Sequence, residues 1–315
     1  MNDSEPRAGT APLAADEPAT AANRLAAVRR RLHTACERAQ RSPASVKLLA
    51  VSKTWPAERV LELAALGQRE FAENYLQEAI EKISACDSAL RQAREETAIA
   101  PSPPARAMPI AASSNAASSN AASSIAGSSM SGNPELIWHF IGPIQSNKTR
   151  PIAEHFDWVH AIERDKIARR LSEQRPADRP ALQVCIQVNV SGETSKSGCA
   201  PDEALALALD VARLPRLRLR GLMAIPEASS DPRILRDRFA SLNRLATTVR
   251  AALAAADPTG SLARDFNTLS MGMSDDLEDA IAEGATIVRI GTALFGKRSL
   301  HTGSIQSPDG KPQGG

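Results

Sequence analysis

The chain has 315 residues, and its 38 lysines and arginines against 36 aspartates and glutamates give a formal net charge of +2. So small a charge argues against nucleic acid or an anionic membrane as the main partner. The sequence has no apolar run of about 18 residues and no basic-then-apolar leader, so we expect a cytoplasmic protein that does not enter a membrane.

Residues 1–20 are rich in alanine, proline and acidic groups, which predicts a disordered tail. A helix is expected from Ala21 to Gln40. Beyond it, apolar runs of strand length alternate with amphipathic stretches of helix length. The predicted strands are Val46–Ser52, Glu70–Ala72, Leu136–Ile141, Trp158–Ile162, Leu182–Val190, Leu217–Ile225, Asn267–Met271 and Ile287–Ile290. The predicted helices between them are Ala57–Leu66, Tyr75–Ile83, Lys148–His155, Asp165–Gln174, Asp202–Ala212, Pro232–Ala255 and Asp276–Ala282.

This alternation favours a parallel sheet, because a βαβ crossover joins parallel strands and covers the sheet. We therefore predict an α/β fold, a TIM (β/α)8 barrel formed by a single domain over residues 21–298, with a doubly wound open sheet as the alternative. An Ala- and Ser-rich insertion, residues 85–133, and a tail, residues 299–315, are predicted to be disordered. The four cysteines have no CxxC spacing, which argues against a metal site and a disulfide framework.

Lys53 follows the apolar run that ends the first strand and precedes Thr54-Trp55-Pro56. A primary amine that loses hydration at such a place is more easily held neutral, and a neutral amine can attack an aldehyde or ketone. In a TIM barrel the reactive groups lie at the carboxyl ends of the strands, where Lys53 is expected. Lys53 is therefore a candidate Schiff-base lysine.

Two neighbouring loops predict a phosphate site. The seventh strand runs into Ser270-Met271-Gly272-Met273-Ser274, and the eighth ends in Arg289-Ile290-Gly291-Thr292. Hydroxyl groups and glycine amides near a helix start can bind an anion, and these two loops are the usual phosphate site of a TIM barrel. The alternative is that Gly272 and Gly291 only permit tight turns.

Arg289 lies within an apolar strand, where an unpaired guanidinium is costly, so it requires an acceptor. Period-two alternation places Arg289 and Gly291 on one face, which points toward a ligand if it is the barrel lumen. The alternative is a salt bridge to a carboxylate such as Asp265.

An amine, a phosphate site and an arginine in one barrel suit pyridoxal 5′-phosphate, with its aldehyde on Lys53 and its ring nitrogen facing Arg289. A guanidinium only donates, so that nitrogen would stay unprotonated and carbanion chemistry would be disfavoured.

Several motifs of the foldable segments carry a resemblance: AVSKT from Ala50, ENYxQE from Glu73, WHFIGPIQSNK from Trp138, NVSGETSKSG from Asn189, RGLMAIP from Arg220, SMGMSDD from Ser270 and VRIGTALFG from Val288. They closely resemble the pyridoxal phosphate homeostasis proteins, the single-domain relatives of alanine racemase.

The resemblance implies a barrel of the alanine racemase N-terminal-domain type that holds pyridoxal 5′-phosphate as an internal aldimine on Lys53. It also implies site roles for eight further residues: Ser270, Gly272, Gly291 and Thr292 would bind the phosphate, Arg289 would reach the pyridine nitrogen, and Asn74, His139 and Met223 would line the ring. Judged from the sequence alone, His139 can equally be a satisfied core histidine, and Asn74 can be a helix cap.

The function implied by the resemblance is vitamin B6 homeostasis by a monomeric protein without an established catalytic reaction. The first hypothesis is a non-catalytic binder that sequesters pyridoxal phosphate or hands it over, with apo-enzymes as candidate recipients. Two alternatives stay open, a racemase-like pyridoxal phosphate enzyme and a Schiff-base aldolase acting on a sugar phosphate. Racemisation requires acid/base groups on both faces of the substrate carbon, usually the lysine and a residue from a second domain, which we do not expect here. The aldolase would be colourless, whereas either pyridoxal phosphate protein would be yellow.

Overall fold

The computed structural model describes residues 20–99, 135–193, 197–227, 229 and 231–296. Parallel strands close in chain order into a barrel, because β1 pairs with both β2 and β8. The strands are β1 (Lys47–Val51), β2 (Glu70–Glu73), β3 (Ile137–Phe140), β4 (Trp158–Ile162), β5 (Leu182–Gln187), β6 (Leu217–Met223), β7 (Thr268–Ser270) and β8 (Ile287–Ile290). An open sheet has no pairing between its first and last strands, so the TIM barrel is confirmed and the open sheet is excluded.

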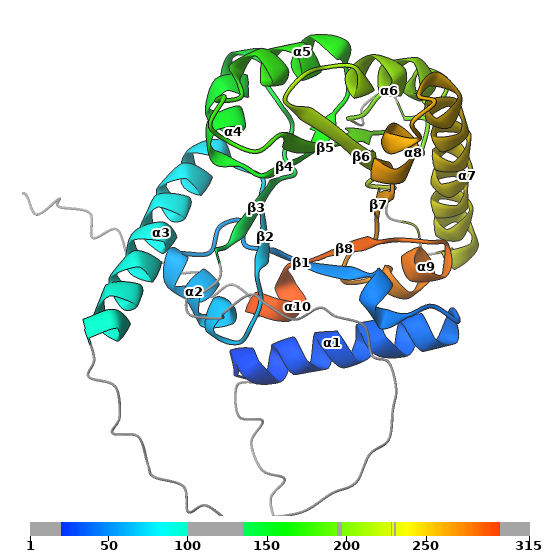
Figure 1. Cartoon of the computed structure of the whole chain (residues 1–315). Coiled ribbons are helices and arrows are strands. Elements are labelled where there is room, and N and C mark those ends of the chain that lie inside the picture. The colour runs from blue at the N-terminus through cyan, green and yellow to red at the C-terminus, as the bar shows by residue number, and fades with distance from the viewer. Residues whose placement is uncertain (1–19, 100–134, 194–196, 228, 230, 297–315) are drawn as a thin grey trace, which may run out of the picture.

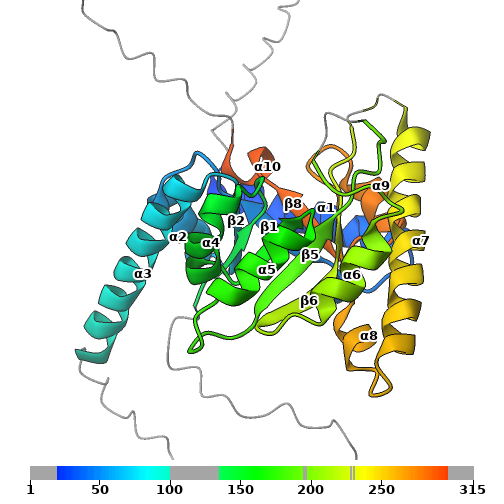
Figure 2. The same ribbon diagram turned by 90° about the horizontal axis from the view of Figure 1, so that it is seen from above.

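Helices surround the strands on the outside (Figures 1 and 2). They are α1 (Ala21–Arg38), α2 (Ala57–Ala65), α3 (Leu76–Ile99), α4 (Thr149–His155), α5 (Asp165–Gln174), α6 (Ala204–Ala212), α7 (Pro232–Ala256), α8 (Ser261–Asp265), α9 (Leu277–Ala282) and α10 (Thr292–Phe295), with single 3₁₀ turns at Pro43–Ser45 and Ser146–Lys148. Helix α1 contacts α2, α9 and α10 and covers the seam where the barrel closes. Its buried residues Leu25, Val28 and Leu32 recur every three or four positions, which gives the helix one apolar face.

Strand boundaries follow local turn chemistry. Strands β4 and β8 have the predicted limits, but β5 ends at Gln187 rather than at Val190. The reason is Asn189, whose Oδ1 accepts hydrogen bonds from the backbone N–H groups of Ser191 and Gly192 at 3.3 and 3.2 Å. Such a turn competes with strand pairing.

Helix α3 corrects the predicted start of the insertion. We expected the helix to end at Ile83 and residues 85–99 to be disordered, yet α3 continues to Ile99. Its second half is rich in Ala, Arg, Gln and Glu, which favour helix, and Cys86 is fully buried against the barrel. The rest of the predicted insertion, the predicted tail 299–315 and residues 1–19 of the other tail lie outside the described residues.

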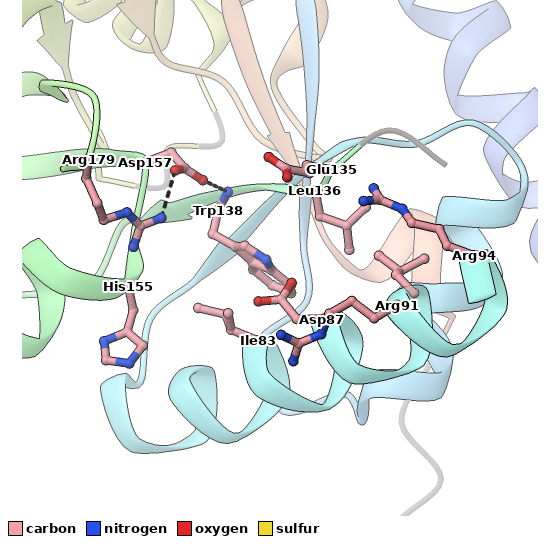
Figure 3. A pocket seen from close by; sticks show the side chains of 11 residues that line it. Ile83, Asp87, Arg91, Arg94, Glu135, Leu136, Trp138, His155, Asp157 and Arg179 are labelled. Atoms are coloured by element: carbon pink, nitrogen blue, oxygen red, sulfur yellow. Dashed lines mark hydrogen bonds and ion pairs between the residues drawn. The ribbon is translucent and has the colours of Figure 1, made fainter. Parts of the chain in front are cut away.

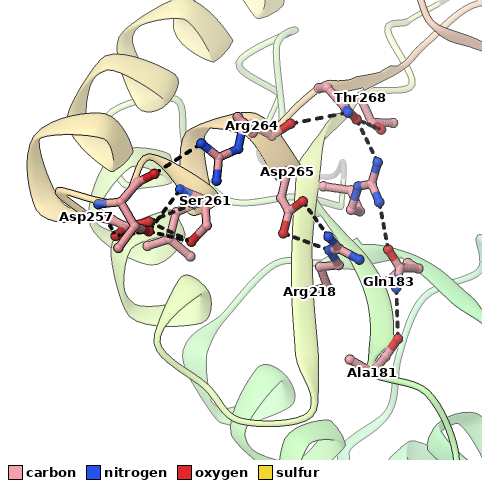
Figure 4. Close-up of polar contacts among 12 residues, drawn as sticks. Ala181, Gln183, Arg218, Asp257, Ser261, Arg264, Asp265 and Thr268 are labelled. Atoms are coloured by element: carbon pink, nitrogen blue, oxygen red, sulfur yellow. Dashed lines mark hydrogen bonds and ion pairs between the residues drawn. The ribbon is translucent and has the colours of Figure 1, made fainter.

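The amino ends of the strands are held by a polar network (Figure 4). Arg218 makes a bidentate pair with Asp265 of α8, with both N–O distances at 2.7 Å. Arg220 donates to Gln183 on β5 and to Asn267 before β7, each at 3.0 Å. These contacts connect three neighbouring strands and leave the opposite rim for a ligand.

None of the described helices combines the length and apolarity that are needed to cross a membrane. The four cysteines, Cys36, Cys86, Cys185 and Cys199, are free and buried. No group of three or more potential metal ligands was found among the described residues.

Candidate cofactor site

The barrel lumen is identified by a small apolar cluster that is separate from the main core. It consists of Leu49, Val51, Ala72, Ile141 and Ile287. In contrast, Ala50, Val288 and Ile290 belong to the core between the strands and the helices. Because side chains alternate along a strand, Lys53 continues the lumen-facing series of Leu49 and Val51, and Arg289 and Gly291 continue that of Ile287. Gly291 also lies against Val51: a Cβ on it would be 3.4 Å from the Val51 carbonyl oxygen. Lys53 and the loop after β8 therefore share one rim.

Lys53 lies in a tight turn between β1 and α2 and is partly exposed. No carboxylate or other hydrogen-bond partner contacts its amine within the described part of the chain. The next residue, Thr54, has φ of +67°, a left-handed conformation that is strained for a β-branched side chain. Strain of this kind often accompanies functional positions.

A buried ionic cluster holds both sides of the turn around Lys53. The Lys82 ammonium donates to the Ser52 carbonyl oxygen at 2.7 Å, to Glu73 Oε1 at 2.6 Å and to Glu78 Oε1 at 2.8 Å. Glu78 Oε1 also accepts from the Thr54 N–H at 2.5 Å. The Lys82 and Glu73 side chains are only 3% and 0% exposed. The cluster therefore fixes the residues on either side of Lys53 and leaves its amine free.

Arg289 is buried, and its guanidinium is anchored at two points. Nη1 donates to Ser270 Oγ and Nη2 donates to the Ala224 carbonyl oxygen, both at 2.9 Å. Burial lowers the pKa of Arg289 to about 10, so the group still carries its charge at neutral pH. The alternative pairing with Asp265 is wrong, because Asp265 binds Arg218 on the opposite rim.

Ser270 is fully buried at the end of β7, and its hydroxyl is engaged twice. It lies 2.9 Å from Arg289 Nη1 and 2.9 Å from His160 Nδ1. His160 Nε2 in turn lies 2.9 Å from Nδ1 of His139. Ser270 Oγ therefore contacts both Arg289 and His160, and His139 is linked to Ser270 through His160.

The loops after β7 and β8, which were predicted to bind a phosphate, are joined to each other. Gly272 has φ of +90°, and a Cβ there would be 2.5 Å from the Ala280 Cβ, so this loop requires glycine. The Gly272 carbonyl oxygen accepts from the Arg289 N–H at 3.0 Å, which joins the two loops. Gly291 precedes α10 and Thr292 begins it. The N–H groups of Leu294 and Phe295 donate to the Gly291 carbonyl oxygen at 2.9 and 3.1 Å, whereas those of Thr292 and Ala293 have no acceptor within their own helix.

Two predicted ring-lining residues lie at the carboxyl ends of their strands. Met223 ends β6, is fully buried, and pairs with Ser270 in register. Asn74 follows β2, and its buried Oδ1 has no hydrogen-bond partner in the described part of the chain. Asn74 also borders a cavity of about 520 Å³ that extends over the loops after β2, β3 and β4. An unpartnered buried acceptor is costly unless a ligand or water completes it.

A second cavity, of about 370 Å³, lies between α3 and the amino ends of β3 and β4 (Figure 3). Its walls mix charges, with Asp87, Arg91, Asp157 and Arg179 among them. It is on the rim opposite Lys53 and is not the predicted site.

Two residues of this arrangement were not predicted from the sequence: Lys82 and His160. Period two places His160 on the face of Trp158 and Ile162, and Lys82 follows Glu78 by the four residues typical of a helix ion pair. Those signals are weak, because most such residues are solvated.

Comparisons with known proteins identify the family of the chain. Residues 24–299 match the family model described as alanine racemase, N-terminal domain. A Pseudomonas aeruginosa protein named pyridoxal phosphate homeostasis protein is 50% identical over 279 residues, 89% of this chain and 96% of that one. A Vibrio cholerae protein of the same name is 45% identical over 269 residues, 85% of this chain and 92% of that one.

Among solved structures, PipY of Synechococcus elongatus with pyridoxal phosphate bound has a TM-score of 0.61 and 30% sequence identity. The match covers 88% of this chain and 100% of that one. Alanine racemase of Corynebacterium glutamicum, at 14% identity and a TM-score of 0.50, shares the fold over 88% of this chain and 62% of its own. The chain therefore belongs to the alanine racemase N-terminal-domain family and, within it, to the pyridoxal phosphate homeostasis proteins.

Proposed function

We propose that this protein binds pyridoxal 5′-phosphate covalently through Lys53 and maintains the cellular supply of the cofactor. The observation that carries the proposal is an amine without a partner among the described residues, on the same rim as a buried, doubly anchored guanidinium and two joined glycine loops. The pyridoxal phosphate bound to the PipY neighbour supports the same ligand.

The residues present fit this cofactor. Lys53 supplies the amine for its aldehyde, and the loops at Gly272 and at Gly291-Thr292 supply backbone amides for its phosphate. Arg289 supplies a donor for the ring nitrogen, while Asn74 and Met223 line the ring. Ser270 and His139, which the resemblance assigned to the phosphate and the ring, act instead through Arg289. When bound, pyridoxal phosphate contributes an electrophilic aldehyde and a pyridine ring that can withdraw electrons.

We further propose that the protein is not an enzyme. Arg289 only donates, so it leaves the ring nitrogen without a proton, which weakens electron withdrawal by the ring. A racemase also requires a second acid/base group opposite the lysine. The single tyrosine, Tyr75, is 56% exposed in the loop after β2. The sugar-phosphate aldolase has no observation in its favour.

The first test is the visible absorption spectrum of the purified protein. The wild type and Lys166→Ala, a change of an exposed lysine on α5, should both be yellow. Lys53→Ala should lose the yellow band, and borohydride treatment should attach the cofactor to the Lys53 peptide only in proteins that retain Lys53. A yellow Lys53→Ala protein, or a label on another lysine, would contradict the assignment.

The second test separates a carrier from an enzyme. The loaded protein is mixed with an apo-enzyme that needs pyridoxal phosphate, and regained activity measures transfer. In parallel, it is incubated with L-amino acids in deuterated water, and loss of the α-proton signal is followed by NMR. We expect transfer without exchange; exchange at the turnover rate of an ordinary enzyme would contradict the carrier. Monomeric state and cytoplasmic location belong to the same proposal, and light scattering and cell fractionation test them.

A further inference from the structure

A continuous line of polar groups crosses the barrel lumen from one rim to the other. It starts at Arg289, passes Ser270, His160 and His139, and ends at Glu70, the first residue of β2. The first three contacts are each 2.9 Å, and the last, His139 Nε2 to Glu70 Oε2, is 3.4 Å. Neither of these last two atoms has a hydrogen bond in the described residues; their 3.4 Å approach is a contact between a ring nitrogen and a carboxylate oxygen.

The far end of the line is tied to a cation at the amino rim. Glu70 Oε1 accepts from the Lys47 ammonium at 2.7 Å, and Lys47 is the first residue of β1. Burial opposes ionisation of Glu70, but His139 and Lys47 outweigh it and lower the pKa of the carboxyl to about 2. Glu70 is therefore a carboxylate at neutral pH and can only accept.

Both histidines are neutral, because burial lowers the pKa of each, and that of His160 falls well below its usual value. Both side chains are 0% exposed, so no bulk water competes for their nitrogens. The His139 ring is also stacked on Trp158, with centroids 5.2 Å apart and an interplanar angle of 10°. The rings are thus held in place, and only their protons remain to be assigned.

The groups at the two ends of the line, Glu70 and Arg289, determine which nitrogen of each ring carries the hydrogen. Glu70 only accepts, so His139 carries its hydrogen on Nε2 and presents a lone pair at Nδ1. His160 must then donate from Nε2, which leaves its own Nδ1 as an acceptor. Ser270 donates its hydroxyl hydrogen to that nitrogen, and its oxygen accepts from Arg289. Every hydrogen bond in the line has the same direction.

We propose that His160 and His139 are positioning residues that form a one-way hydrogen-bond relay, in which Glu70 sets the direction and Ser270 is kept as an acceptor for Arg289. The relay explains why the Ser270 hydroxyl is not available as a phosphate donor. Only one part of this inference rests on the proposed function, namely the assignment of Arg289 to the ring nitrogen of the cofactor. The direction of the relay does not depend on a cofactor.

The test is long-range ¹H–¹⁵N NMR of the imidazole rings in the full chain, recorded both as purified and after removal of cofactor. The sequence has five histidines, so single His→Gln variants suffice to assign the signals. We expect both His139 and His160 as neutral rings protonated on Nε2. A proton on Nδ1 of either ring, or a charged ring at neutral pH, would overturn the relay.

Glu70→Gln should reverse the relay. Lys47 holds an oxygen at the Oε1 position, so the amide nitrogen faces His139 and can only donate. His139 must then carry its hydrogen on Nδ1, and His160 must donate from Nδ1 to Ser270. The matched control is Glu62→Gln, which removes an exposed carboxylate paired with Arg59 and should change neither ring.

Ser270→Ala gives an independent check at the other end of the relay. It removes the donor to His160 but leaves Glu70, so both rings should keep their hydrogens on Nε2. A switch in this variant, or unchanged rings in a folded Glu70→Gln protein, would show that Glu70 does not set the direction. If the rings behave as expected and no pyridoxal phosphate binds, the proposed function fails and the relay stands.

Discussion

Lys82→Met removes a cation from one of the most buried ionic contacts in the described part of the chain. The ammonium lies 2.6 Å from Glu73 Oε1 and also contacts the Ser52 carbonyl oxygen and Glu78. Methionine has a similar aliphatic stem, so packing should change little, whereas the Glu73 carboxylate loses its counter-charge. Glu73 Oε2 already has no hydrogen-bond partner among the described residues. Removal of one member of a buried ion pair costs about 3–5 kcal/mol.

The loss of stability in Lys82→Met should depend on pH, because protonation neutralises Glu73. Burial raises the pKa of Glu73 above its ordinary value of 4.5 even beside Lys82. Without Lys82 the pKa rises further, so above pH 4.5 the folded variant binds more protons than the unfolded chain. Stability then falls as pH rises, by up to about 1.4 kcal/mol per pH unit. We expect a loss of about 1 kcal/mol near about pH 5 and of about 3–4 kcal/mol near about pH 8.

The assay is urea unfolding followed by both tryptophan fluorescence and circular dichroism, since agreement of the two tests two-state behaviour. The control is Arg218→Met. It breaks an ion pair whose arginine side chain is 50% exposed, so we expect a loss below about 1 kcal/mol with little pH dependence. Addition of Glu73→Gln to Lys82→Met should abolish this pH dependence, because the carboxylate that lost its counter-charge is gone. If Lys82→Met is no worse than Arg218→Met at either pH, the buried cluster does not exist in solution.

Three further predictions follow from other contacts. Gly272→Ala places a Cβ 2.5 Å from the Ala280 Cβ at φ of +90°, so denaturation should show a loss of about 1–3 kcal/mol; an unchanged midpoint would contradict the loop geometry. Because the pKa of Glu70 is lowered from 4.5 to about 2, its stabilisation is present above pH 4.5 and lost as pH falls toward about 2. Acid titration of Glu70→Gln should therefore be flatter across that interval than that of the wild type. Burial raises the pKa of Cys185 to about 12, so about one thiol in 10⁴ is ionised near about pH 8. Peptide mapping should find Cys185 alkylated only after unfolding, and rapid labelling of the native protein would refute this.

The sequence by itself determined the order of the strands and helices in the barrel and the place of Lys53 after the first strand. Apolar alternation and turn residues are local properties, so runs such as 158–162 and 287–290 could be read as strands to their exact limits. Lys53 was predicted for the same reason, since its place after a strand is a property of the sequence, and its role stays a prediction. The same local signal wrongly predicted disorder for residues 85–99. Their apolar content is low, but they contain good helix formers, and Cys86 among them is fully buried.

Only the tertiary structure decided what the polar residues contact. Ser270 and His160 are 110 residues apart in sequence, and they meet because barrel closure brings their side chains together across the lumen. Likewise no pattern in the sequence pairs Lys82 with Glu73 or with the carbonyl oxygen of Ser52, and α3 brings these groups together. The physical reason is that a hydrogen bond depends on distance and direction to within a fraction of an ångström, which local pattern does not specify.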